Sequence, residues 1–171
     1  MTCGLALGAV GSAVIAYARG PSVLGILVAG SVALAFGVAP VGTLATDLIV
    51  GIAPPERAGA ASAISETSAE LGGALGIAVL GSVGAAIYRR AMPSDLALSG
   101  LPRGSEAARA TLGATVALAK RLPDALGAPL LIAARDAFTL ALHVTAGVGC
   151  AVLLTAAVLS GIGLRAERPN V

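Results

Sequence analysis

The stretch Ser22–Ile52, SVLGILVAGSVALAFGVAPVGTLATDLIVGI, decides the class of this protein because it is apolar throughout and contains a single charged residue, Asp47. An α-helix rises about 1.5 Å per residue and a bilayer's hydrocarbon core is about 30 Å thick, so roughly 20 apolar residues cross it. Pro40 removes a backbone hydrogen-bond donor inside this run and is expected to kink the helix. The stretch predicts a transmembrane helix.

The whole chain has the composition of an integral membrane protein. Of its 171 residues, 57% are hydrophobic and 12% are charged, and the mean hydropathy is +0.93. A soluble domain carries about 25% charged residues, so the surface of this protein must face lipid. Soluble enzymes and disordered tails fit this composition poorly, and the net charge of +2 is too small to suggest nucleic acid as a partner.

Other apolar runs complete the expected fold, which is all-α with about four transmembrane helices and one long loop, 89–129. Within the loop, Ser105–Leu122 has the composition of a short helix with Ser105 as its N-cap. We expect this helix to lie on the membrane surface or on neighbouring spans. The predicted spans are 2–18, 22–52, 57–88 and 130–164.

The third span carries two carboxylates, Glu66 and Glu70, at positions where a charge is costly. Residues four apart share one helix face, and Glu66 is nine residues beyond Arg57, which places it about 14 Å into the span. A carboxylate that binds either a proton or a cation, but not both, can couple the movements of the two. The alternative is a pair of protonated acids hydrogen-bonded to neighbouring helices.

Glycines follow the carboxylates on the same helix. Gly72, Gly73 and Gly76 include a GxxxG pattern, and Gly4 and Gly8 form another in the first span. Small residues let two helix backbones approach closely in a membrane, so we interpret these glycines as helix-packing positions.

The remaining polar and reactive residues indicate no catalytic or metal site. Pro55, Glu56 and Arg57 form a turn before the third span, where proline is tolerated in a first helical turn and a carboxylate faces the positive end of the helix dipole. Cys3 and Cys150 lie in apolar runs without a second ligand at metal-binding spacing, and we interpret them as packing residues. No nucleophile is paired with a base, so we expect neither an enzyme nor a cofactor.

Residues 54–81, PPERAGAASAISETSAELGGALGIAVLG, strongly resemble the C-terminal end of a 14-span drug/proton antiporter of the major facilitator superfamily. The group is DHA2, which includes quaternary-ammonium and other multidrug efflux pumps. The entry to the last span, ARDAFTLALH at 134–143, fits the same family. The resemblance covers essentially the whole chain, and residues 54–81 carry most of its specificity.

This resemblance implies that the four spans correspond to spans 11–14 of the family. Glu66 then matches an acidic position linked to cationic-substrate recognition or proton coupling, and Glu70 matches a second, often acidic position. The family's topology places the C-terminus in the cytoplasm and loop 89–129 outside the cell membrane. The positive-inside rule favours the opposite orientation, because eight basic residues lie on the loop's side against three on the other. We follow the family, since preceding spans would fix the orientation.

The resemblance also implies that 171 residues form only a partial C-terminal transporter bundle, which is not expected to transport alone. Alternating access needs two bundles that move about a central site. The expected partners are the lipid bilayer, the missing spans or a partner subunit, protons, and cationic or lipophilic small molecules. The alternative is a small membrane assembly protein or an inactive truncated product.

Overall fold

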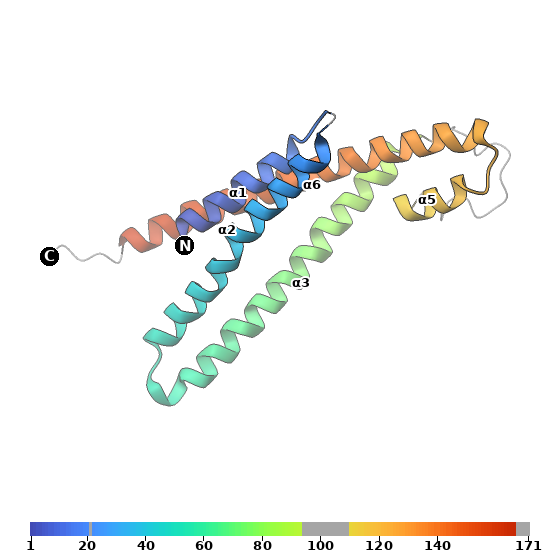
Figure 1. Ribbon diagram of the computed structural model, residues 1–171. Coiled ribbons are helices and arrows are strands. Elements are labelled where there is room, and N and C mark those ends of the chain that lie inside the picture. The colour runs from blue at the N-terminus through green and yellow to red at the C-terminus, as the bar shows by residue number, and fades with distance from the viewer. Residues whose placement is uncertain (21, 94–109, 167–171) are drawn as a thin grey trace. The chain divides into compact units, whose positions relative to one another are not determined.

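The computed structural model describes residues 1–20, 22–93 and 110–166, and these residues form helices and connecting turns without a strand (Figure 1). The all-α prediction is confirmed. Helices dominate because, in a membrane, a helix satisfies its backbone hydrogen-bonding groups within one segment. The elements in chain order are α1 (Thr2–Ala16), α2 (Val23–Ile52), η1 (Pro55–Arg57), α3 (Ala58–Ala91), α5 (Leu112–Ala119) and α6 (Asp124–Ala166).

Among the described residues, three helical segments are long and apolar enough to cross a membrane: Val23–Ile52, Pro55–Ala91 and Asp124–Gly163. The first predicted span is shorter than expected, because α1 has 15 residues and ends at Ala16. At about 1.5 Å per residue it covers about 22 Å, less than the hydrocarbon core. Helix α2 continues through Pro40.

The loop before the last span contains more helix than its prolines suggested. Helix α6 begins at Asp124 instead of near Leu130, because the carbonyl of Pro123 accepts from the first amides of the helix and Pro129 is accommodated early in it. Helix α5 is capped by Thr111, whose side chain accepts from the amide of Ala114 at 3.2 Å. The predicted N-cap, Ser105, lies outside the described residues.

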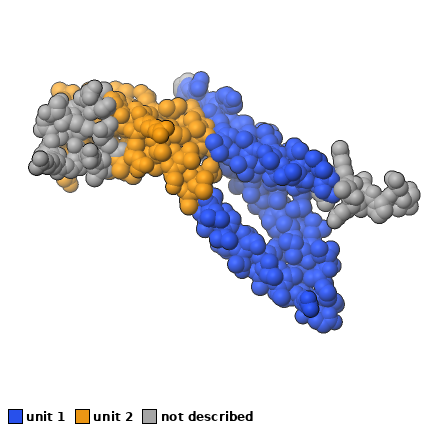
Figure 2. Space-filling model, turned by 180° about the vertical axis from the view of Figure 1, so that it is seen from behind, with its two compact units in different colours: residues 1–77, 146–171 blue, residues 78–145 orange. Residues whose placement is uncertain are grey.

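The chain divides into two compact units, which Figure 2 colours separately: Met1–Ile77 with Ala146–Val171, and Ala78–Thr145. In the first unit, α1 packs against α2 through glycines. A Cβ atom at Gly37 would lie 2.6 Å from the carbonyl oxygen of Gly4 and would also meet Gly8. A Cβ atom at Gly11 would lie 2.6 Å from the carbonyl oxygen of Gly30. Only glycine permits this approach.

Two side-chain hydrogen bonds connect other helices of the first unit. Ser12 of α1 is buried and its Oγ donates to the carbonyl of Ala146 in α6 at 2.8 Å. Thr46 of α2 and Ser65 of α3 share a hydrogen bond of 3.0 Å between their hydroxyl oxygens. Each bond joins segments far apart in the sequence and restricts how the helices can slide.

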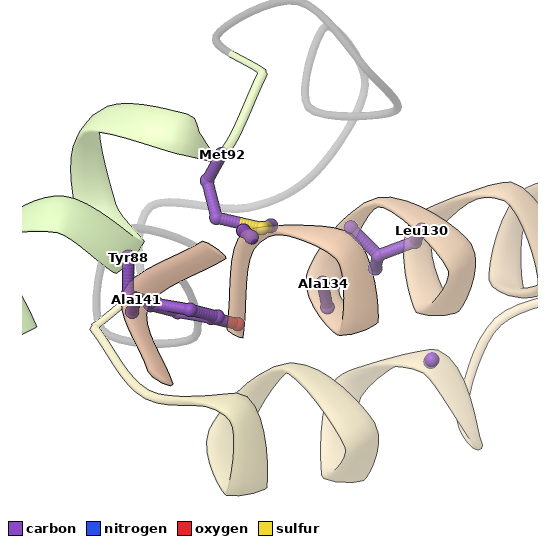
Figure 3. Packing of buried hydrophobic residues seen from close by; sticks show 7 residues of the cluster. Tyr88, Met92, Leu130, Ala134 and Ala141 are labelled. Atoms are coloured by element: carbon purple, nitrogen blue, oxygen red, sulfur yellow. The ribbon is translucent and has the colours of Figure 1, made fainter. Parts of the chain in front are cut away.

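In the second unit, α5 packs on α3 and α6. The hydroxyl of Tyr88 lies 2.9 Å from Oγ1 of Thr115, and both residues are buried. Of the two placements expected for the loop helix, the structure has the one on neighbouring helices. The buried apolar cluster of this unit (Figure 3) contains Tyr88, Met92, Ala119, Leu130, Ala134, Ala137 and Ala141.

Candidate functional site

The two carboxylates predicted from the sequence lie on one continuous stretch of α3 in the first unit. Glu66 and Glu70 are separated by one helical turn, so they share a face, with Cβ atoms about 6 Å apart. Glu66 is eight residues beyond Ala58, the start of α3, or about 12 Å along the helix axis. Both side chains are exposed, and among the described residues neither forms a salt bridge. The face they mark is therefore open for another molecule or helix.

A polar contact next to Glu66 anchors this part of α3. The hydroxyls of Thr46 and Ser65 bond across the α2–α3 pair, and Ser65 directly precedes Glu66 in the chain. Within α3, the hydroxyl of Thr67 donates a hydrogen bond to the carbonyl of Ala63, one turn earlier, at 2.8 Å. Sequence reasoning missed the Thr46–Ser65 pair. The pair could have been predicted from a hydroxyl residue in each of two consecutive spans, because such residues often hydrogen-bond across membrane helices.

The glycines predicted to pack helices divide into two groups. Gly4 and Gly8 of α1 contact α2 closely, as described above. Cβ atoms at Gly72, Gly73 and Gly76 would meet no atom of the described residues within 4 Å. Packing at this second group stays a prediction.

The turn before α3 forms as a short 3-10 helix, with Pro55 in its first turn. The amide of Arg57 donates to the carbonyl of Pro54 at 2.8 Å, and α3 continues from Ala58. Glu56 and Arg57 are exposed. The turn leads directly into α3.

The His, Cys, Asp and Glu side chains are scattered over the part of the chain that the structure describes. It contains no group of three or more His, Cys, Asp or Glu side chains that could hold a metal ion. Cys3 and Cys150 are free thiols. The chemistry available on α3 is that of carboxylates on an apolar helix, which bind protons or cations.

Comparison with known proteins identifies relatives along nearly the whole chain. It is 36% identical to the multidrug efflux pump LfrA of Mycolicibacterium smegmatis over 165 residues, which are 96% of this chain and 32% of LfrA. Its homologues are multidrug efflux and resistance proteins. They include the methyl viologen resistance protein SmvA of Salmonella typhimurium, 37% identical over 61% of this chain and 21% of SmvA. The tetracenomycin C resistance and export protein of Streptomyces glaucescens is 40% identical over 47% of this chain and 15% of its own length.

The names of LfrA and of the Streptomyces protein describe efflux and export. The chain spans about a third or less of the length of each of these relatives. No family model and no solved structure matches it. Together, the apolar helices and the relatives make this a membrane protein related to drug efflux pumps.

Proposed function

We propose that this chain forms the C-terminal four-helix part of a proton-coupled multidrug antiporter of the 14-span DHA2 group in the major facilitator superfamily. Similarity to LfrA over 96% of the chain supports the transport role. The observation that carries the proposal is the Glu66–Glu70 pair, exposed on one face of an apolar helix. Intramembrane carboxylates are expensive and mark ion or substrate pathways.

In this proposal, Glu66 is the coupling or substrate-binding carboxylate and Glu70 modulates it. A cationic drug and a proton compete for Glu66, so release of one accompanies binding of the other. The open face of α3 receives the remaining transporter spans or a partner subunit, because alternating access requires a second bundle. The substrate class is cationic or lipophilic small molecules.

The proposed orientation in the cell membrane places loop 89–129 outside and the C-terminus in the cytoplasm. Under this arrangement, the turn at Pro55 is cytoplasmic and α3 runs from the cytoplasm outward. The carboxylates then lie in the half of α3 that begins at the cytoplasmic side, where a drug captured from the cell would first meet them.

The test is export of a cationic dye from cells by a full transporter that contains these residues. Glu66→Gln keeps the size of the side chain but removes its charge, so dye export should be abolished while the amount of protein in the membrane stays unchanged. Glu70→Gln should weaken export less. Glu56→Gln, in the turn before α3, is the matched control and should export normally. Unchanged export by Glu66→Gln contradicts the assigned role.

A second candidate function is membrane assembly without transport, and the open glycines of α3 favour it. Gly72, Gly73 and Gly76 present backbone that a partner helix could approach. Crosslinking in membranes separates this candidate from an inactive truncated product, because an assembly protein forms a defined crosslinked species and an inactive product stays monomeric. Replacing Gly76 with Leu should remove that species.

A further inference from the structure

The face of α3 that meets α2 is narrow and carries one polar group. Among residues 58–75, only Ala58, Ala61 and Ser65 are half-buried, and the others are exposed. Their spacing of three and four residues places them on one helix face. On this face, Ser65 shares its hydrogen bond of 3.0 Å with Thr46 of α2. Methyl groups slide along a neighbouring helix at little cost, so the hydroxyl pair sets how α3 is rotated against α2.

Ser65 is also the last half-buried residue of α3 before the two carboxylates. Residues 66–75 are all exposed, and a Cβ atom at Gly72 or Gly73 would meet no described atom within 4 Å. No described contact in this stretch therefore fixes the rotation of α3. The direction in which Glu66 points depends on the Thr46–Ser65 pair, one residue earlier in the helix.

Helix geometry shows where this pair turns the neighbouring side chains. Helices α2 and α3 run antiparallel on either side of their short connecting turn (Figure 1). One residue is a turn of about 100°, so Glu66, directly after Ser65, is turned by this angle from the contact. Asp47, directly after Thr46, is turned by the same angle, and in an antiparallel pair both point to the same flank. They are two residues, or about 3 Å, apart along the axis. Ile64, directly before Ser65, points to the opposite flank.

We propose that Thr46 is a positioning residue for Glu66. Through its bond to Ser65, the hydroxyl of Thr46 fixes the rotation of α3 and keeps Glu66 on one flank of the helix pair, where the cationic substrate binds it. Without the bond, Glu66 spends part of the time turned away, and the apparent affinity falls with the populated fraction of the binding arrangement. This inference rests on the proposed role of Glu66 in transport, but the rotation of α3 is measurable without transport.

Cysteine crosslinking in membranes measures the rotation, in a chain without its two native cysteines. The pair Asp47→Cys and Glu66→Cys should crosslink with a short bifunctional thiol reagent. The pair Asp47→Cys and Ile64→Cys is the matched control and should crosslink poorly, because Ile64 is level with Asp47 but on the opposite flank. Thr46→Val keeps the branched shape without the hydroxyl and should lower the ratio of the two yields about threefold, as expected for an average hydrogen bond between membrane helices. Thr46→Ser should keep the ratio.

Dye export by a full transporter that contains these residues measures the functional effect. Thr46→Val and Ser65→Ala should each raise the KM for a cationic dye about threefold, while the maximal rate per transporter in the membrane stays near the wild-type value. The double variant should match either single one, because the same bond is lost in all three. Thr46→Ser should keep the wild-type KM. Thr67→Val is the control, since Thr67 is turned away from α2 and bonds to its own helix.

Three results would overturn the proposal. The first is a crosslinking ratio that does not change when the hydroxyl of Thr46 is removed. The second is an unchanged KM in Thr46→Val, in a transporter that Glu66→Gln inactivates, because the proposed function would then stand without the positioning role. The third is a KM raised as much by Thr67→Val as by Thr46→Val, which would indicate a general disturbance of α3. Normal export by Glu66→Gln would instead remove the proposed function, and the crosslinking ratio would still report whether Thr46 orients α3.

Discussion

Single hydroxyl groups fix contacts in this protein that apolar packing leaves adjustable. Tyr88 and Thr115 pair inside an otherwise apolar cluster, and Thr46 and Ser65 pair between two apolar helices. Leucine and alanine side chains can slide along one another at little cost, whereas a buried hydroxyl must keep its partner. At the scale of the residue, these pairs therefore determine the register of helices whose remaining contacts are weakly specific.

Replacing Tyr88 with Phe tests the buried pair of the second unit. The variant keeps the ring but loses one hydrogen bond, so we expect a loss of about 0.5–1.5 kcal/mol and faster amide hydrogen exchange in α5. The loss stays modest because Thr115 also donates to the carbonyl of Thr111 at 3.0 Å. Tyr17→Phe is the control, since Tyr17 is 79% exposed. Unchanged exchange in Leu112–Ala119 would show that the pair does not hold α5.

A double-mutant cycle tests the hydroxyl pair next to Glu66. Thr46→Val and Ser65→Ala should interact by about 0.6 kcal/mol, the average for hydrogen bonds between membrane helices. The pair Thr46→Val and Thr67→Val should show no interaction, because the hydroxyl of Thr67 bonds to its own helix. Unfolding of each variant by denaturant in mixed micelles supplies the free energies. Equal interaction energies in the two cycles would contradict a direct bond between α2 and α3.

At the scale of the element, the helices differ in what their glycines do. On α1 and α2, glycines remove side chains at the contact so that the two backbones touch. On α3, Gly72, Gly73 and Gly76 have no described atom within 4 Å of a Cβ atom built on them, whereas Gly84 lies against Thr145. The GxxxG pattern therefore indicates that another helix backbone can approach closely. The approach occurs only where the fold places a helix opposite the glycines.

Gly37→Ala and Gly42→Ala should have opposite effects on stability although both lie in α2. A Cβ atom at Gly37 would overlap the backbone of α1, which cannot move aside as a side chain can, so we expect a loss of about 1–3 kcal/mol. A Cβ atom at Gly42 meets no described atom within 4 Å, and alanine favours the helix by up to about 1 kcal/mol. Thermal unfolding in detergent measures both. Changes of the same sign would show that α1 does not pack there.

At the scale of the whole molecule, α6 is longer than a helix needs to be to cross a bilayer. Helix α6 has 43 residues and is about 65 Å long, twice the thickness of the hydrocarbon core. Arg135 and Asp136 interrupt its apolar sequence. We therefore expect the beginning of α6, which carries α5, to extend beyond the hydrocarbon.

Cysteine labelling tests this placement in a chain whose Cys3 and Cys150 are replaced by alanine. Leu126→Cys should react with a membrane-impermeant maleimide, and Val152→Cys should react only after detergent is added. The structure leaves Leu126 45% exposed and Val152 61% exposed, so a difference between them reports the bilayer and not protein burial. Labelling of Leu126→Cys in intact cells would support the proposed orientation, and labelling only in inverted vesicles would contradict it.

The sequence by itself determined the properties that depend on composition and on neighbours along one helix. These are the membrane class, the helical fold, and the shared face of Glu66 and Glu70, because hydrophobicity and a spacing of four residues are local quantities. The start of the last span was not determined by the sequence. Its prolines suggested a start near Leu130, whereas α6 begins at Asp124, since proline is accommodated near the beginning of a helix.

Only the tertiary structure decided which of several similar sequence patterns form contacts between helices. It placed Gly4 and Gly8 of α1 in contact with α2 and left Gly72, Gly73 and Gly76 of α3 without a described atom nearby. It also joined Tyr88 to Thr115 and Thr46 to Ser65. These outcomes depend on residues far apart in the sequence, and no local pattern specifies which distant surface a helix face will meet.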